Sequence, residues 1–319
     1  MPSTTSKYPH GVQRVTRDTP VEDIFWLLKR DGGVVVTNFL DRATVEQTNS
    51  EIAHRLEADK PWSGSFFPGE TRRATAMNTY APTFTKTQLM DPIYQAVVRH
   101  FLTTTNTFWW GNEQKKSVSL PQISATTGIQ IGPGAPDQEI HRDDYIHHQV
   151  HTEISEWVDD RDLNTRETAV GLFVAGSRAT KANGATRFIP GSHLWGNEHK
   201  PIETDANTFR AELEVGDAFL MLGSCYHGGS ANKTADQSRL VYATFCTRGF
   251  LRQEENQYLI ISPDSLKKHD RKTQRVLGWA ISEPYLGWVD FQDPLKLVYP
   301  EEFASSAPTD LASGQNKYN

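Results

Sequence analysis

The chain has 319 residues, of which 37% are hydrophobic, 10% aromatic and 23% charged, a composition typical of globular proteins and not of disordered ones. Its formal net charge of -6 disfavours a broad phosphate-binding surface, so no nucleic-acid partner is expected. No apolar run approaches the ~18–20 residues that cross a bilayer, and the first residues lack the apolar core of a secretion signal. We therefore expect a cytoplasmic protein without a membrane partner.

The first third of the chain shows helix patterns. Thr19 followed by proline predicts the start of a helix, which two glycines end after residue 31, and a short buried strand follows over 34–36. Apolar residues at helical spacing predict a second helix around 45–56. Asp91, again followed by proline, predicts the start of a third.

From about residue 117 the apolar period changes to two. Apolar and polar residues alternate over 123–131, which predicts a strand with one face on a core. Further strands, separated by turn residues, are predicted over 168–174, 186–189, 209–213, 218–222 and 240–246. Many short strands predict a mainly β fold with flanking helices, a sandwich or barrel.

The same patterns divide the chain into three parts. A helical layer is predicted after Ser262, and the residues from 305 have the composition of a loose tail. We therefore expect an N-terminal arm over 1–18, one domain over 19–304 and a flexible tail over 305–319.

His141 and Asp143 form the best candidate for a metal site. If the strand over 123–131 continues through them, their side chains project from one face. His227 follows another predicted strand and is the best placed of the remaining histidines to add a third ligand. Two imidazoles and one carboxylate are typical of non-haem Fe(II) oxygenases, in which three vacant positions accept a bidentate 2-oxo acid and dioxygen. With only two cysteines in the chain, a thiolate-only zinc site is excluded.

A dicarboxylate co-substrate also needs a cation for its distal end. Arg239 directly precedes the predicted strand over 240–246, so a connecting loop can return it to the cavity that holds His227. Its guanidinium can grip a carboxylate with two parallel hydrogen bonds. Gln138, three residues before His141, can donate to the metal-bound end.

Three motifs resemble the phytanoyl-CoA dioxygenase-like family: 138–144, 183–193 and 226–229, in that order. Stretches over 31–36, 252–258 and 286–290 agree with it, so the resemblance covers roughly residues 20–290. It is nearest to fungal members that oxidise alkaloids and meroterpenoids in secondary metabolism.

The resemblance implies a double-stranded β-helix, or jelly roll, framed by helices. It also implies an Fe(II)- and 2-oxoglutarate-dependent dioxygenase acting on a mostly apolar polycyclic small molecule, and makes a homodimer an expectation. His141, Asp143 and His227 match the family's iron ligands. The positions that match its contacts to 2-oxoglutarate are Gln138, Thr186 and Arg239.

Asp143 also bears on the type of reaction. Related halogenases replace this carboxylate with a small residue, so halogenation is not expected here. Hydroxylation, desaturation, epoxidation, endoperoxidation and rearrangement stay open. A zinc-dependent hydrolase and a non-catalytic cupin-like binding module are the alternatives, and neither requires a buried cation such as Arg239 near the metal.

The stretch over 62–85 is rich in glycine, proline and aromatic residues, which predicts a long irregular segment over the cavity. The candidates for the substrate pocket are Phe67, Met77, Tyr80 and Tyr145. Histidines at 147, 148, 151 and 193 are expected to be surface or supporting residues. Tryptophans at 109, 110 and 279 are expected to pack in the core or against helices.

Overall fold

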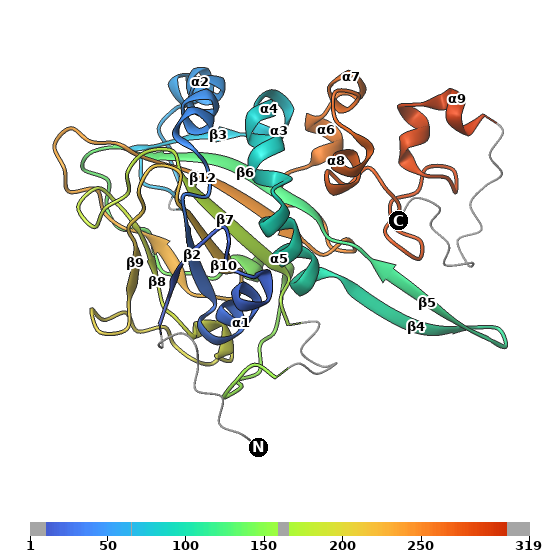
Figure 1. Cartoon of the computed structure of the whole chain (residues 1–319), viewed down its shortest axis with the longest axis horizontal. Helices are drawn as coiled ribbons and strands as arrows, with labels where there is room; N and C mark the ends of the chain where they lie inside the picture. The colour runs from blue at the N-terminus through green and yellow to red at the C-terminus, as the bar shows by residue number, and fades with distance from the viewer. Residues whose placement is uncertain (1–10, 65, 159–165, 305–319) are drawn as a thin grey trace.

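A seven-stranded sheet forms the centre of the computed structural model, which describes residues 11–64, 66–158 and 166–304 (Figure 1). The strands in these residues are β1 (Arg14–Thr16), β2 (Gly33–Thr37), β3 (Thr71–Thr75), β4 (Thr104–Trp110), β5 (Glu113–Ser119), β6 (Gln122–Ile131), β7 (Ala169–Ala175), β8 (Thr186–Phe188), β9 (Phe209–Ala211), β10 (Ala218–Leu222), β11 (His227–Gly229) and β12 (Arg239–Thr247). The large sheet has the order β1-β2-β10-β7-β12-β6-β3, a smaller sheet has the order β11-β8-β9, and β4 pairs with β5. Only β1 and β2 run parallel among these described pairs. The strands predicted from the alternating pattern are thus present.

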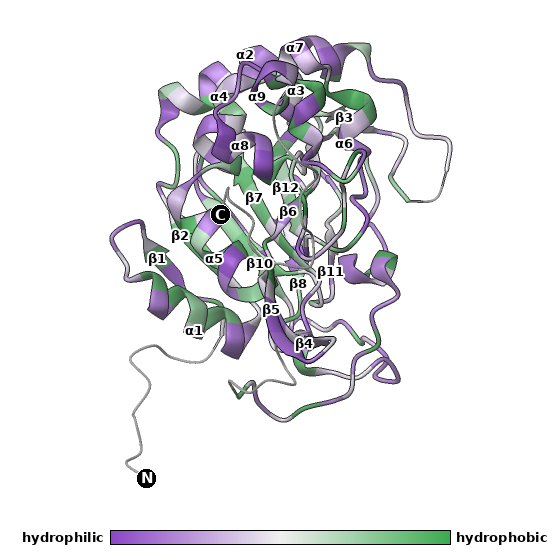
Figure 2. Ribbon diagram, turned by 90° about the vertical axis from the view of Figure 1, so that its right-hand side faces the viewer, coloured by the Kyte–Doolittle hydropathy of each residue, from purple (hydrophilic) through white to green (hydrophobic). Residues whose placement is uncertain are grey.

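Helices flank the large sheet. They are α1 (Val21–Asp31), α2 (Arg42–Ala58), α3 (Met77–Tyr80), α4 (Pro82–Phe84), α5 (Pro92–Leu102), α6 (Gln257–Ile260), α7 (Pro263–Leu266), α8 (Arg271–Val276) and α9 (Pro300–Phe303). Short helices of other types are η1 (Thr85–Leu89), η2 (Asp143–His147), η4 (Ser192–Leu194) and η5 (Pro294–Leu297). Contacts from α2, α3, α5 and α8 cover one face of the large sheet. Figure 2 shows apolar residues along β7 and polar ones on the outward sides of α2 and α8, as expected for this layering.

Local sequence explains where the longer helices begin and end. Asp91 caps α5, because its carboxylate accepts a hydrogen bond from the backbone N–H of Ile93 at 2.9 Å. The helix α1 ends at Gly32, whose φ of 77° is left-handed and whose missing Cβ leaves room for the side chains packed against it. This helix begins at Val21 and its N-cap is Pro20, one residue after Thr19, where the sequence predicts the helix start.

Aromatic packing closes one end of the space between the two sheets. Phe219 of β10 contacts Phe188 of β8 and Phe209 of β9, with ring centroids 5.0 and 6.0 Å apart. Further along, β6, β7 and β12 face β8 and β11 across a cavity. The functional residues discussed below lie in this cavity.

Alternate residues of β6 serve different faces of the large sheet. Ala125 and Thr127 line the cavity, whereas Thr126 and Gly128 face the helices. The hydroxyl of Thr126 accepts a hydrogen bond from the backbone N–H of Met77 at 2.9 Å. The predicted alternation of side chains along β6 is confirmed. The face expected to pack on a core forms a wall of the cavity instead, and the opposite face is covered by helices.

The structure differs from the predicted segments in two places. The arm expected over 1–18 contains β1, which pairs with β2 in the large sheet. Of this arm, residues 1–10 lie outside the described residues. The segment over 62–85, predicted to be irregular, contains β3, α3 and α4. The expected tail over 305–319 lies outside the described residues.

The hairpin of β4 and β5 was not predicted, and it projects away from the two sheets (Figure 1). Trp109 and Trp110 lie on it and are 68% and 51% exposed, so their expected place in the core is wrong. Trp279 is buried, as predicted.

Tyr94 fastens α5 to the two central strands. Its buried hydroxyl lies 3.0 Å from the carbonyl oxygen of Val170 on β7 and 3.1 Å from that of Thr244 on β12. We expect Tyr94→Phe to lower the free energy of unfolding by about 1–2 kcal/mol, the typical contribution of a buried hydrogen bond. Urea unfolding measures this loss, and Tyr145→Phe, at an exposed position, should leave the midpoint unchanged. Equal midpoints for wild type and Tyr94→Phe would contradict the assignment.

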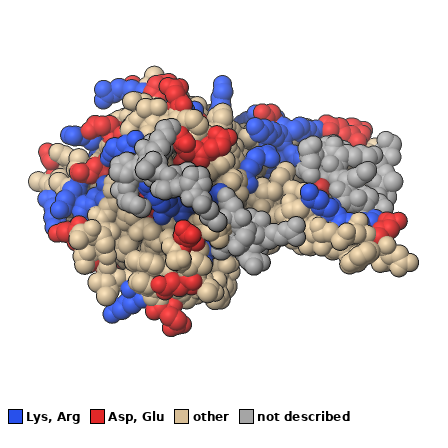
Figure 3. Space-filling model, turned by 60° about the horizontal axis from the view of Figure 1, so that its bottom comes forward, with Lys and Arg blue, Asp and Glu red and all other residues tan. Residues whose placement is uncertain are grey.

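The described residues on the face shown in Figure 3 form no broad basic patch. On the face shown in Figure 3, basic and acidic side chains are interspersed. Among the described helices, none combines the length and the apolar character required to traverse a bilayer.

Candidate metal centre and its pocket

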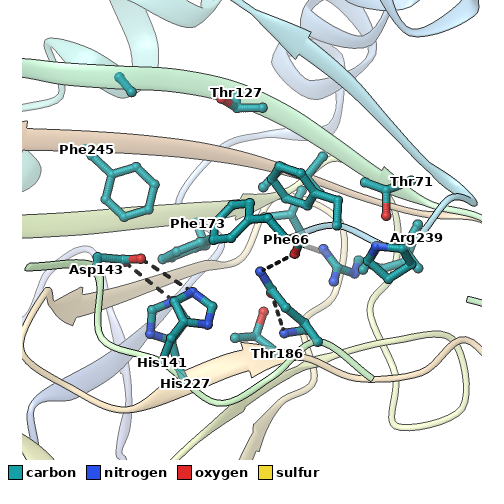
Figure 4. A pocket seen from close by; sticks show the side chains of 18 of the residues that line it. Phe66, Thr71, Thr127, His141, Asp143, Phe173, Thr186, His227, Arg239 and Phe245 are labelled. Atoms are coloured by element: carbon teal, nitrogen blue, oxygen red, sulfur yellow. Dashed lines mark hydrogen bonds and ion pairs between the residues drawn. The ribbon is translucent and has the colours of Figure 1, made fainter. Parts of the chain in front are cut away.

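His141, Asp143 and His227 come together at one wall of the cavity (Figure 4). The Nε2 atoms of His141 and His227 lie 3.7 and 3.5 Å from the carboxylate oxygens of Asp143. The two imidazole rings are 4.7 Å apart between centroids. One potential ligand atom from each residue lies within 4.8 Å of the other two, as a shared metal ion requires.

The backbone reaches this arrangement by a different route from the predicted one. The strand β6 ends at Ile131 and does not continue to His141. Instead, His141 and His227 form an isolated antiparallel bridge, in which each backbone N–H donates to the other's carbonyl at 2.9 Å. Asp143 begins η2, and its N–H donates to the carbonyl of Gly223 at 3.0 Å. Backbone hydrogen bonds therefore hold the three side chains in place.

Each imidazole is oriented by a carbonyl two residues earlier in the chain. Nδ1 of His141 lies 2.8 Å from the carbonyl oxygen of Glu139, and Nδ1 of His227 lies 3.1 Å from that of Cys225. Since a carbonyl oxygen can only accept, Nδ1 carries the proton in both rings. Both Nε2 atoms then present a lone pair toward Asp143, which is the form in which histidine binds a metal.

The electrostatics of the cluster favour a bound cation. Burial lowers the pKa of His227 to about 4, and burial together with the neighbouring His227 lowers the pKa of His141, so both rings are neutral near pH 7. Burial raises the pKa of Asp143 to about 7, and its Oδ2 atom has no hydrogen-bond partner among the described residues. A divalent ion would satisfy this buried oxygen and stabilise the ionised carboxylate, so the donor set fits iron.

Arg239 lies at the other end of the cavity (Figure 4). Its side chain is 3% exposed, and Nε donates to the carbonyl of Gly184 at 2.9 Å. No carboxylate in the described part of the chain pairs with the guanidinium, and burial lowers its pKa to about 10. The nearby hydroxyl of Thr71 is buried and also lacks a partner. A buried cation without a counter-ion is costly, so this end of the cavity suits an anionic ligand.

Gln138 and Thr186, the positions expected beside a co-substrate, both line the cavity, and Thr186 lies between its two ends (Figure 4). The amide of Gln138 donates to the carbonyl of Phe66 at 3.3 Å and accepts from the N–H of Gly229 at 3.1 Å. It therefore links the segment around Phe66 to β11. Thr186 begins β8 and faces the cavity from the small sheet.

Two of the four predicted pocket residues are placed correctly. Phe67 and Tyr145 line the cavity, but Met77 and Tyr80 do not. Met77 is fully buried beneath the opposite face of β6. Tyr80 packs against His54 on the helix side of the sheet, with ring centroids 5.4 Å apart. The prediction was wrong because β3 and α3 carry this part of the segment away from the cavity.

The four histidines expected to be surface or supporting residues lie outside the set of proposed metal ligands. Nδ1 of His147 lies 2.9 Å from the hydroxyl oxygen of Thr168. His148 is exposed. Nε2 of His151 lies 2.5 Å from Asp144 in a buried pair. His193 is buried, and its Nε2 lies 2.9 Å from the carbonyl oxygen of Lys29 at the end of α1, where it can donate.

Sequence reasoning missed several residues of the cavity. The rings of Phe173 and Phe245 pack edge to face above the three proposed metal ligands, with centroids 5.5 Å apart. Phe66 lies near His141. The two strand phenylalanines occupy alternate positions of predicted strands, but nothing in their pattern separates a cavity wall from a core. Glu254 also lines the cavity and lies in a stretch that supports the family resemblance without a role of its own.

Comparison with known proteins supplies independent information. A family model described as phytanoyl-CoA dioxygenase (PhyH) matches residues 28–241. The dioxygenase himG of Aspergillus japonicus is 36% identical over 287 residues, covering 87% of this chain and 87% of that protein. The dioxygenase cnsJ of Penicillium expansum is 34% identical over 287 residues, covering 89% of this chain and 84% of its own length.

Among solved structures, the epimerase SnoN in complex with Fe3+, alpha ketoglutarate and nogalamycin RO superposes with a TM-score of 0.52. It shares 16% sequence identity, and the match covers 75% of this chain and 88% of that one. At this identity the likeness concerns the fold alone, and it confirms the expected double-stranded β-helix.

Proposed function

Because the chain belongs to the phytanoyl-CoA dioxygenase family and is an iron- and 2-oxoglutarate-dependent dioxygenase, we propose that His141, Asp143 and His227 hold its iron. The observation that carries this assignment is the convergence of two neutral imidazoles and one carboxylate on a single cavity. Iron bound there would supply the activation of dioxygen, coupled to decarboxylation of 2-oxoglutarate.

Arg239 would bind the distal carboxylate of 2-oxoglutarate. The guanidinium is buried and has no carboxylate partner in the described residues, so a ligand carboxylate would offset the cost of its desolvation. Two parallel hydrogen bonds from one guanidinium would also fix the direction of the co-substrate. Thr71, Thr186 and Gln138 line the same cavity, so their hydroxyls and amide could bind its oxygens.

The primary substrate would be a mostly apolar small molecule. The cavity wall beside the proposed metal ligands is formed by Phe66, Phe173 and Phe245, which would exclude water from the metal. Asp143 supports oxidation without halogenation, because this chain retains the carboxylate that related halogenases replace with a small residue. Which oxidative outcome follows depends on how the substrate is held against this wall.

Arg239 also separates this function from the two alternatives. A zinc-dependent hydrolase needs the three ligands and a water molecule, and a cupin-like binding module needs only the metal. Neither accounts for an unpaired guanidinium buried in the same cavity.

Three further features belong to the proposal. A role in fungal secondary metabolism is supported by the relatives himG and cnsJ, which are named dioxygenases of an Aspergillus and a Penicillium. A cytoplasmic location is part of the proposal, and so is a homodimer, for which the exposed Trp109 and Trp110 offer an apolar subunit contact. We place the enzyme domain over 14–304, since β1 extends the sheet beyond the boundary predicted at 19.

Anaerobic titration tests the metal and co-substrate assignments directly. We expect Fe(II) followed by 2-oxoglutarate to produce the weak visible charge-transfer absorption of an iron-bound 2-oxo acid, at one equivalent of each. The absorption should be absent when His227→Ala is titrated. Tight binding of zinc without any such absorption would favour the hydrolase instead.

A further inference from the structure

Glu254 lines the cavity, but it is not one of the three proposed metal ligands and is not part of the proposed binding site for the distal carboxylate at Arg239. It follows β12 and lies beside β6, where its backbone N–H donates to the hydroxyl of Ser124 at 3.3 Å. Its carboxylate has no hydrogen bond or ion pair with any described residue. Glu254 is exposed to solvent, so its carboxylate is open to a cationic group of a ligand that enters the cavity.

The sum of charges in a cavity that holds iron and 2-oxoglutarate also singles out the carboxylate of Glu254. The charges of divalent iron, the Asp143 carboxylate, the Arg239 guanidinium and the 2-oxoglutarate dianion cancel. Both histidine ligands are neutral. Glu254 is the remaining group among the described lining residues that is charged at neutral pH, so a cavity filled with metal and co-substrate keeps one unbalanced negative charge.

The cavity that Glu254 lines is rich in aromatic rings. The lining rings are Phe66, Phe67, Tyr145, Phe173 and Phe245. Aromatic faces attract ammonium groups, and a carboxylate accepts strong hydrogen bonds from them. The same walls accommodate an apolar body, so the combination matches a cationic organic molecule better than a neutral or anionic one.

We propose that Glu254 determines specificity by selecting substrates that carry a protonated amine on an apolar body. This inference rests on the proposed function and adds the chemical class of the substrate.

The surroundings of Glu254 support this choice. Desolvation by the surrounding atoms and the nearby charge of Asp143 raise the pKa of Glu254, so its ionised form carries a penalty here even though the residue is exposed. A cation bound beside it reverses that penalty, whereas an anionic substrate adds to it.

Three probes of similar size and different charge test the inference: 2-phenylethylamine, 2-phenylethanol and 3-phenylpropionate. Binding is measured by calorimetry on protein loaded with Ni(II) and 2-oxoglutarate, so that no turnover occurs. We expect the amine to bind about tenfold more tightly than the alcohol, the effect of one charge-assisted hydrogen bond, and the acid to bind least. In Glu254→Gln the preference for the amine should fall to about one.

Glu255→Gln is the matched control. It removes the same charge from the next residue, whose carboxylate accepts from the side chain of Gln257 at 3.5 Å and does not line the cavity. The amine preference should persist in this variant. Equal affinities in wild type, a preference that survives Glu254→Gln, or no binding of the amine at millimolar concentration would each overturn the inference.

The same experiment separates this inference from the proposed function. If Ni(II) and 2-oxoglutarate fail to bind, the proposed function is wrong, while the three probes still report on Glu254 in the metal-free protein. If both bind and the amine is not preferred, only the assignment of Glu254 is wrong.

Discussion

His141→Ala and Asp143→Ala are each expected to abolish the release of succinate from 2-oxoglutarate. Each removes one of three side-chain ligands, and since residues that merely orient ligands already contribute about 10–100-fold, we expect a loss beyond about a hundredfold. Succinate formed per enzyme under saturating Fe(II) and 2-oxoglutarate measures the effect. Anaerobic metal titration should show weaker iron binding in the same variants.

Both variants should keep the fold. The backbone N–H groups of His141 and Asp143 hold the site together, and alanine retains them. Asp143→Ala also removes a buried oxygen that has no partner in the described structure, so thermal melting should not fall. His148→Ala, at an exposed histidine nearby, is the control and should retain full activity. Global unfolding of either ligand variant, or succinate formation at the wild-type rate, would refute the ligand assignment.

Arg239→Ala is expected to raise the concentration of 2-oxoglutarate required for activity by about thirtyfold or more. Truncating one partner of a buried charge pair costs about 2 kcal/mol at the lower end, and the guanidinium has no protein carboxylate to share its role. The KM for 2-oxoglutarate and its anaerobic binding constant should change together. Iron binding without co-substrate should stay close to wild type.

Arg239→Lys and Arg72→Ala sharpen this test. Lysine restores the charge without the two-pronged geometry, so it should recover only part of the affinity. Arg72 lies on β3 near the same end of the cavity, where its guanidinium donates to the carbonyls of Gly69 and Thr71 and does not line the cavity. Its replacement should leave the requirement unchanged. An unchanged requirement in Arg239→Ala would assign that arginine another role.

The residues proposed to carry the chemistry could be selected from sequence because several of them lie next to a strong local signal. His227 follows the continuous apolar run of β10, and Arg239 opens the apolar β12, so both were placed near strand ends. His141 was identified for a partly wrong reason: it reaches the site through its bridge to His227, and no periodicity in the sequence reveals such a bridge.

Elements without an apolar stripe could not be found in this way. The strand β3 carries Arg72 and Arg73 and lies at the edge of the large sheet, where polar side chains reach solvent. The hairpin of β4 and β5 is exposed along most of its length, so its alternation has no buried side. Met77 was misplaced because its position depends on which face of β6 the helix α3 covers.

Along β6, β7 and β12, residues that line the cavity alternate with residues on the opposite face of the sheet, and this alternation affects how enzymes of this type can diverge. Cavity positions such as Thr127 and Val241 alternate with positions such as Thr126 and Tyr242 that contact the helical layer. Neutral drift can therefore replace cavity residues one at a time while the neighbouring scaffold contacts persist. Enzymes with this fold can therefore come to accept new substrates through point substitutions in three strands, with little change in thermal stability.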